Sequence, residues 1–271
     1  MTDDEKRRIY LTDDEIRKRY ERDGGPMGAN QEAITKFIQM MRAHEKSENS
    51  YVREIIAGLE NLQSIAPNFT IFQSPDKDFF MHQFKALTIS LTSGDLVMSH
   101  EFGHALLGMI NGLQIPEKFE EVVERAYNHS KSTEIIPKLR EYIKRISNPD
   151  LPEVTEAEKG PVSDIISAIH LNGAFRINGE IYILPSYHPR SYYQNEKTGE
   201  RKIKQIFDEC FANIYALMAN NHHKELEDIK TLFGEEFFQV MNAELEKAAK
   251  TINRISEKTI HNSSEEEFRF L

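Results

Sequence analysis

Hydrophobic residues near the start of the chain recur at helical spacing. The apolar positions are Ile34, Phe37, Ile38 and Met41, then Val52, Ile55, Ile56, Leu59 and Leu62. Spacing of three and four residues places such side chains on one helix face, so the pattern predicts a pair of helices over 30–65. Two β-rich runs, over 68–73 and 84–91, follow and predict two strands of a small sheet. Helical spacing returns over 95–111.

The second half of the chain is also mainly helical in pattern. Helices are predicted over 117–147, 163–170, 203–220 and 224–255, with Asp164 or Ser163 as the N-cap of the second. A proline- and acid-rich stretch over 148–162 is expected to be a surface loop, and the alternating Gly-Glu-Ile-Tyr-Ile-Leu is strand-like. A hairpin-like turn is expected over 194–199.

The fold class that follows is α+β. We expect a mainly helical fold in which a small β-sheet precedes the helix over 95–111. The predicted organisation is a charged N-terminal arm and hinge over 1–29, a main domain over 30–255, and an acidic polar tail over 256–271.

Composition narrows the classes of partner. The chain has 271 residues and a net charge of −10, which disfavours nucleic acid and anionic membrane surfaces as the main partner. The single cysteine, Cys210, excludes an internal disulfide and a thiolate metal cage. The sequence shows neither a signal peptide nor a transmembrane run, so a cytoplasmic location is the default expectation, while signal-independent export as an effector and the oligomeric state stay open.

The motif that indicates chemistry is His100-Glu101-Phe102-Gly103-His104. Histidines at i and i+4 lie one above the other on a helix face, where both imidazoles reach one Zn²⁺ ion. Glu101, beside the first histidine, is placed to take a proton from a zinc-activated water as general base.

A catalytic zinc site needs a third protein ligand, and Glu209 is the best candidate. It lies in a strongly periodic helix and shares a face with Ala212 and Ala216, whose small side chains allow close approach of another element. Asp208 points about 100° away and is the weaker choice. His188 and Asp164 are the remaining alternatives; Asp164 is interpreted first as a helix cap and otherwise as support for a ligand histidine.

These motifs resemble two groups of zincin proteins. His-Glu-Phe-Gly-His-Ala-Leu, followed downstream by Glu209-Cys210-Phe211-Ala212, resembles the protease domain of anthrax lethal-factor-like toxins, whose third zinc ligand is the Glu of such a helix. The segments over 163–169 and 187–193 are similar to HExGH proteins encoded with phage head genes. Together the two resemblances span roughly residues 85–245.

The chain departs from the toxin pattern at one functional position. In the toxins a tyrosine that assists the oxyanion lies within two helical turns before the Glu ligand, and here that stretch contains none. Because a tetrahedral intermediate needs a donor for its oxyanion, we expect His188, Tyr192 or Tyr193 to supply it, with His188 first.

The resemblance implies a zincin-like metalloprotease fold, with the domain over 30–255 as the catalytic domain. The sequence therefore predicts a gluzincin-like, zinc-dependent endopeptidase that acts on a protein or peptide substrate. The main alternative is a phage or mobile-element structural or interaction protein that keeps the zincin fold without proteolytic activity. A metal hydrolase that acts on bonds other than peptide bonds is a third interpretation.

Overall fold

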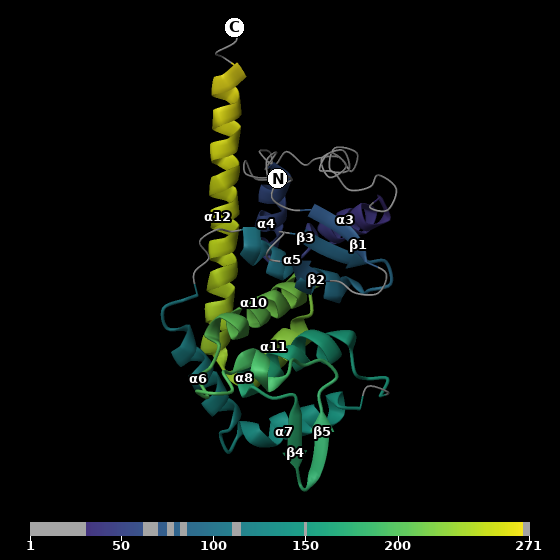
Figure 1. Cartoon of the computed structure of the whole chain (residues 1–271), viewed down its shortest axis with the longest axis vertical. Helices are drawn as coiled ribbons and strands as arrows, with labels where there is room; N and C mark the ends of the chain where they lie inside the picture. The colour runs from purple at the N-terminus through teal and green to yellow at the C-terminus, as the bar shows by residue number, and fades with distance from the viewer. Residues whose placement is uncertain are drawn as a thin grey trace. The chain divides into compact units, whose positions relative to one another are not determined.

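A computed structural model of the chain describes residues 31–61, 70–74, 79–81, 86–109, 115–148 and 151–267. The chain divides into two compact units, residues 1–113 with 245–271, and residues 114–244. The structure is mainly helical with small sheets (Figure 1), which confirms the predicted fold class. The N-terminal arm lies outside the described residues, and the single catalytic domain expected over 30–255 stays a prediction.

The first unit places helices beside a three-stranded sheet. Its elements are α3 (Gln31–His44), α4 (Ser50–Asn61), β1 (Thr70–Ser74), β2 (Phe79–Met81), β3 (Ala86–Ser90) and α5 (Asp95–Met109). The apolar positions that predicted α3 and α4 are buried, apart from Leu62, which lies outside the described residues. Asn49 caps α4 by accepting hydrogen bonds from the backbone of Tyr51 and Val52.

The sheet has one more strand than the sequence predicts. β1 pairs with β3 in parallel, with Thr70 opposite Ala86, and β2 pairs with β3 antiparallel. The prediction of two strands is therefore wrong, because it omits β2. The three residues of β2 are too few to show the alternation of apolar and polar positions that identifies a strand. The sheet directly precedes α5, as predicted.

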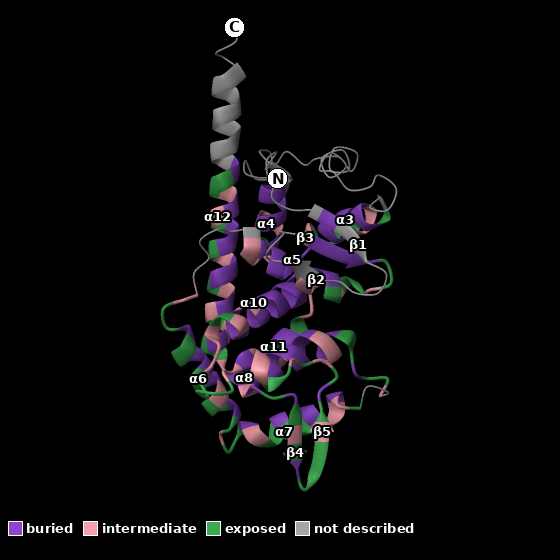
Figure 2. Ribbon diagram, in the orientation of Figure 1, coloured by how far each residue is buried: buried purple, intermediate pink, exposed green. Residues whose placement is uncertain are grey.

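The second unit is built around α10. Its elements are α6 (Phe119–Ser130), α7 (Ile135–Ile146), the π-helix η2 (Glu158–Val162), α8 (Ser163–His170), β4 (Ala174–Ile177), β5 (Glu180–Ile183), α9 (Arg190–Tyr193), α10 (Ile203–Ala219) and α11 (His223–Phe233). Every residue of α10 from Glu209 to Ala219 is buried, so α10 is its central helix (Figure 2). None of the described helices is both long and apolar enough to cross a bilayer.

The C-terminal helical region begins where it was predicted but differs from the prediction in its interior and at its C-terminal end. Gly234, whose φ is 89°, separates α11 from α12 (Glu235–Glu267), where one helix over 224–255 was expected. Glycine adopts this conformation without strain, which is why it ends α11. Helical backbone also continues to Glu267, beyond the predicted end at residue 255.

The stretch predicted as a surface loop over 148–162 instead contains a buried charge. Glu158 is 0% exposed and receives two hydrogen bonds from Arg145, at 2.9 and 2.7 Å, and one from Lys224 at 3.0 Å. Burial alone raises the pKa of Glu158, but these hydrogen bonds and one from the Thr155 backbone outweigh it and lower the pKa to about 2. The prediction of a surface loop is therefore wrong for Glu158–Val162, which form a π-helix with a buried acidic residue, because the paired cations offset the free-energy cost of burying its charge.

Glu158→Gln is expected to destabilise the protein by about 3 kcal/mol at pH 7. A lowered carboxyl pKa contributes stability that is complete above the unfolded-state value and is lost as the pH falls toward the folded-state value. The difference from the wild type should therefore shrink as the pH falls from about 4.5 toward about 2. Urea unfolding followed by circular dichroism between pH 7 and pH 3 measures this.

The matched control is Glu156→Gln, because the Glu156 side chain is 80% exposed and pairs with Lys159 one helical turn away. That change should alter the free energy of unfolding by less than about 0.5 kcal/mol. Equal effects of the two substitutions, or a Glu158 effect that does not change with pH, would contradict the account.

Candidate metal centre

Helix α5, which carries the His-Glu-Phe-Gly-His motif, is fixed by contacts within the first unit. Phe102 packs edge-to-face on Phe37 of α3, with ring centroids 5.7 Å apart. The Ser99 hydroxyl lies 2.9 Å from Nε2 of the buried His44 and donates to the Asp95 carbonyl oxygen. Burial lowers the pKa of His44 to about 3, so this imidazole is neutral near pH 7. Ser99 directly precedes His100, so these contacts fix the helix turn on which the motif begins.

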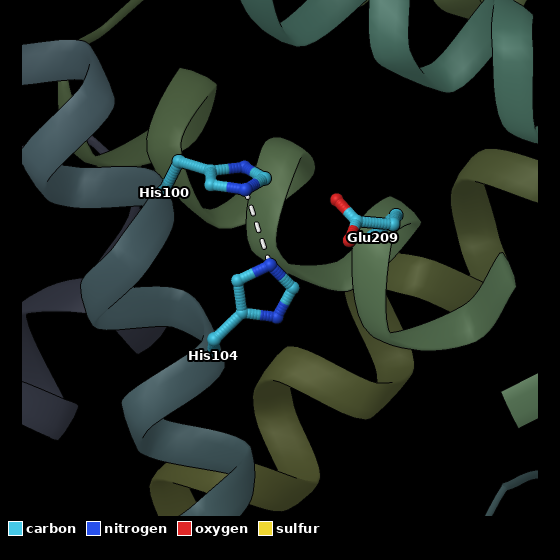
Figure 3. A group of neighbouring side chains, drawn as sticks. All are labelled: His100, His104 and Glu209. Atoms are coloured by element: carbon cyan, nitrogen blue, oxygen red, sulfur yellow. Dashed lines mark hydrogen bonds between the residues drawn. The ribbon is translucent and has the colours of Figure 1, made fainter. Parts of the chain in front are cut away.

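His100 and His104 direct their side chains to the same place. Their Nε2 atoms are 3.1 Å apart and their ring centroids 4.6 Å apart. Two nitrogens bound to one tetrahedral Zn²⁺ at ~2.0–2.1 Å would lie about 3.3 Å apart, so the observed spacing fits a shared ion. In the structure the rings share a hydrogen bond at this spacing (Figure 3).

Glu209 is a buried carboxylate on α10. Glu209 is 2% exposed. Its backbone carbonyl oxygen accepts a hydrogen bond from the side-chain amide of Asn213 at 2.9 Å. Ala212 and Ala216, which share its face, are 0% exposed. The neighbouring Asp208 instead forms an ion pair with Lys204. Glu209 is therefore not the solvated surface residue that a glutamate in a helix usually is.

His100, His104 and Glu209 form a group that could hold a metal ion. One ligand atom of each lies within 4.8 Å of the other two (Figure 3). Two imidazoles and one carboxylate are the donor set of many catalytic zinc sites, and the residues thus fit Zn²⁺ chemically. Among the described residues, no second group of three such side chains comes as close together. Glu101 lies on α5 beside His100 and is partly exposed.

The segment over 187–193 meets Glu209. The Tyr192 hydroxyl donates to Glu209 Oε1 at 3.0 Å, and His188 Nε2 lies 3.5 Å from the same oxygen. The His188 ring stacks on Tyr192, with centroids 4.3 Å apart and planes 23° apart. Tyr193 is fully buried and meets both rings edge-to-face. Burial, followed by the charge of Glu209, raises its pKa.

Asp164 does not cap helix α8. The N-cap position is Val162, and no side chain caps the helix, so the caps predicted at Asp164 and Ser163 are both wrong. The chain continues from the π-helix η2 into α8 without a break, which leaves no free helix end to cap. The buried Asp164 carboxylate instead accepts a hydrogen bond from the Ser186 hydroxyl at 2.8 Å, and Ser186 lies two residues before His188.

The contact between Tyr192 and Glu209 is the feature that the sequence reasoning missed. The two residues are 17 positions apart, and no helical spacing relates them. The signal that could have found it is the turn over 194–199, which was predicted and is confirmed by the pairing of Gln194 with Arg201. A tight turn there folds the segment before it back onto the start of α10.

Comparison with protein families, with curated proteins and with solved structures finds no match for this chain. The resemblance to toxin proteases and phage-associated proteins therefore rests on the motifs alone. What the structure supports of it is the buried group of His100, His104 and Glu209, which is consistent with an HExxH motif completed by a glutamate.

Purified protein is expected to bind about one zinc per chain, and His104→Ala and Glu209→Ala should each weaken that binding. The loss should exceed the ~10–100-fold typical of a residue that only supports a ligand. Asp208→Ala is the matched control, since it removes the adjacent carboxylate, and should leave affinity unchanged. Competition with a chromogenic chelator measures all three variants.

Zinc retained at wild-type occupancy in the double variant His100→Ala/His104→Ala would contradict this assignment. If Glu209→Ala alone kept wild-type affinity, the third ligand would have to be sought at His188 or Asp164.

Proposed function

We propose that the protein is a zinc-dependent endopeptidase of the gluzincin type. The observation that carries the proposal is the group of two imidazoles and a buried carboxylate, with the carboxylate of Glu101 next in sequence to the first imidazole. Histidine pairs that serve only packing have no need of a buried glutamate nearby, whereas a catalytic zinc site uses this donor set and an adjacent general base.

Bound Zn²⁺ would lower the pKa of a water to about 7 and polarise the scissile carbonyl. Glu101 accepts the proton of the attacking water and then delivers it to the leaving amine. His188, whose side chain is 39% exposed, is the proposed donor to the oxyanion. Tyr193 is less suited to that role because it is fully buried.

The proposed substrate is a protein or peptide, because the chemistry derived for Glu101 and His188 is addition of water to an amide carbonyl. The net charge of −10 supports a substrate other than nucleic acid. A structural or interaction protein with the same metal group would bind zinc equally well, and activity measurements separate the two functions.

Glu101→Gln is expected to keep zinc and the fold but to lower peptide hydrolysis by about 10²–10⁴-fold, because the general base is lost while all three ligands remain. Turnover of a fluorogenic peptide library at fixed zinc content measures this. Asp95→Asn is the matched control: it removes an exposed carboxylate from the same helix and should leave turnover near the wild-type value.

Absence of hydrolysis by the wild-type protein with one zinc bound would contradict the proposal and favour the non-catalytic interpretation. Hydrolysis of esters or non-peptide amides alone would instead indicate a different metal hydrolase. Loss of zinc from Glu101→Gln would mean that Glu101 is a ligand.

A further inference from the structure

Tyr192 is held in place by the turn that precedes α10. Its backbone N–H donates to the Pro189 carbonyl within the single turn of α9, at 2.8 Å. The Lys202 N–H donates to the Tyr193 carbonyl at 2.8 Å, and the Lys202 ammonium donates to the Ser191 carbonyl at 2.7 Å. The segment that carries the tyrosine is thus bonded, on both sides of it, to the residue that precedes α10.

The local geometry aims the Tyr192 hydroxyl at the carboxylate of Glu209. A tyrosine hydroxyl has one proton, and here that proton is donated to Oε1 at 3.0 Å. Stacking on His188 and edge contact with Tyr193 restrict rotation of the Tyr192 ring. The Glu209 carboxylate therefore accepts a hydrogen bond from a donor whose orientation does not depend on a bound metal.

A fixed hydrogen bond to one oxygen of a carboxylate sets the orientation of the whole group. Carboxylates that bind metals are themselves usually hydrogen-bonded, and these partners contribute to metal affinity. A donor to the oxyanion has a different requirement, because its proton must be directed at the reacting carbonyl. The bond to Glu209 uses the one proton that Tyr192 has to give.

We infer that Tyr192 is a positioning residue, which orients the Glu209 carboxylate for metal binding and leaves the oxyanion to another donor. This inference rests on the proposed function only in that Glu209 is taken as a metal ligand. The sequence suggests Tyr192 as a donor to the oxyanion, whereas this inference makes it a partner of the metal ligand. Loss of the hydroxyl should therefore weaken metal binding and leave turnover of the metal-loaded protein nearly unchanged.

The test is Tyr192→Phe, which removes only the hydroxyl and keeps the stacked ring. Zinc affinity, measured by competition with a chromogenic chelator at pH 7.4, should fall by about 10–100-fold. At saturating zinc, turnover per bound ion should stay within about 3-fold of the wild type, because the hydroxyl does not touch the reacting atoms. Circular dichroism establishes that the variant is folded.

Tyr193→Phe is the matched control. It removes the same hydroxyl one residue later, from a buried side chain whose oxygen has no hydrogen-bond partner in the described part of the chain. Its zinc affinity should stay within about 2-fold of the wild type. An equal loss of affinity in both variants would overturn the inference, since the effect would then come from general packing.

A double-variant cycle separates failure of this inference from failure of the metal site. If Tyr192 acts through Glu209, then Tyr192→Phe should weaken zinc binding no further in a Glu209→Ala background. Unchanged affinity of Tyr192→Phe, with turnover lowered 10²–10³-fold, would overturn the inference and assign the hydroxyl to the oxyanion. Unchanged affinity of Glu209→Ala would overturn both the inference and the proposed metal ligand.

Discussion

A carboxylate that is 2% exposed must be met by hydrogen-bond donors or by a cation, because transfer of an isolated charge out of water is strongly unfavourable. The local structure around Glu209 satisfies this constraint. The Tyr192 hydroxyl donates to Oε1, and His188 Nε2 lies 3.5 Å from the same oxygen. One nitrogen each of His100 and His104 lies within 4.8 Å of a Glu209 carboxylate oxygen. A bound Zn²⁺ ion would add the positive charge that compensates the buried carboxylate. The burial of this one acidic side chain thus determines what its surroundings must contain.

The buried glutamate of the second unit provides an informative comparison. Glu158 is equally hidden, but Arg145 and Lys224 neutralise it with direct ion pairs. Those cations make it a structural charge, whose removal should alter stability and not chemistry. At Glu209, the Tyr192 phenol and the His188 imidazole instead lie against one carboxylate oxygen, and two further imidazoles come within 4.8 Å. Such groups support a carboxylate that can bind a cation from solution.

Local geometry explains which features could be predicted from the sequence. The i, i+4 spacing of His100 and His104 fixes their relation as soon as a helix forms, and the small residues on the face of Glu209 indicated its burial. The role of Tyr192 could not be predicted, because its contact with Glu209 depends on a turn that brings together residues 17 positions apart. The burial of Glu158 was missed for the same reason: Lys224, one of its partners, is distant in sequence.

We propose that one zinc ion is bound by His100, His104 and Glu209. A crystal structure of the zinc-loaded protein, with anomalous data collected on both sides of the zinc absorption edge, tests it most directly. We expect one anomalous peak per chain, within ~2.0–2.2 Å of the Nε2 atom of each histidine and of a Glu209 carboxylate oxygen. A zinc peak at other side chains, or histidines that stay hydrogen-bonded to each other without metal in the presence of excess zinc, would contradict it.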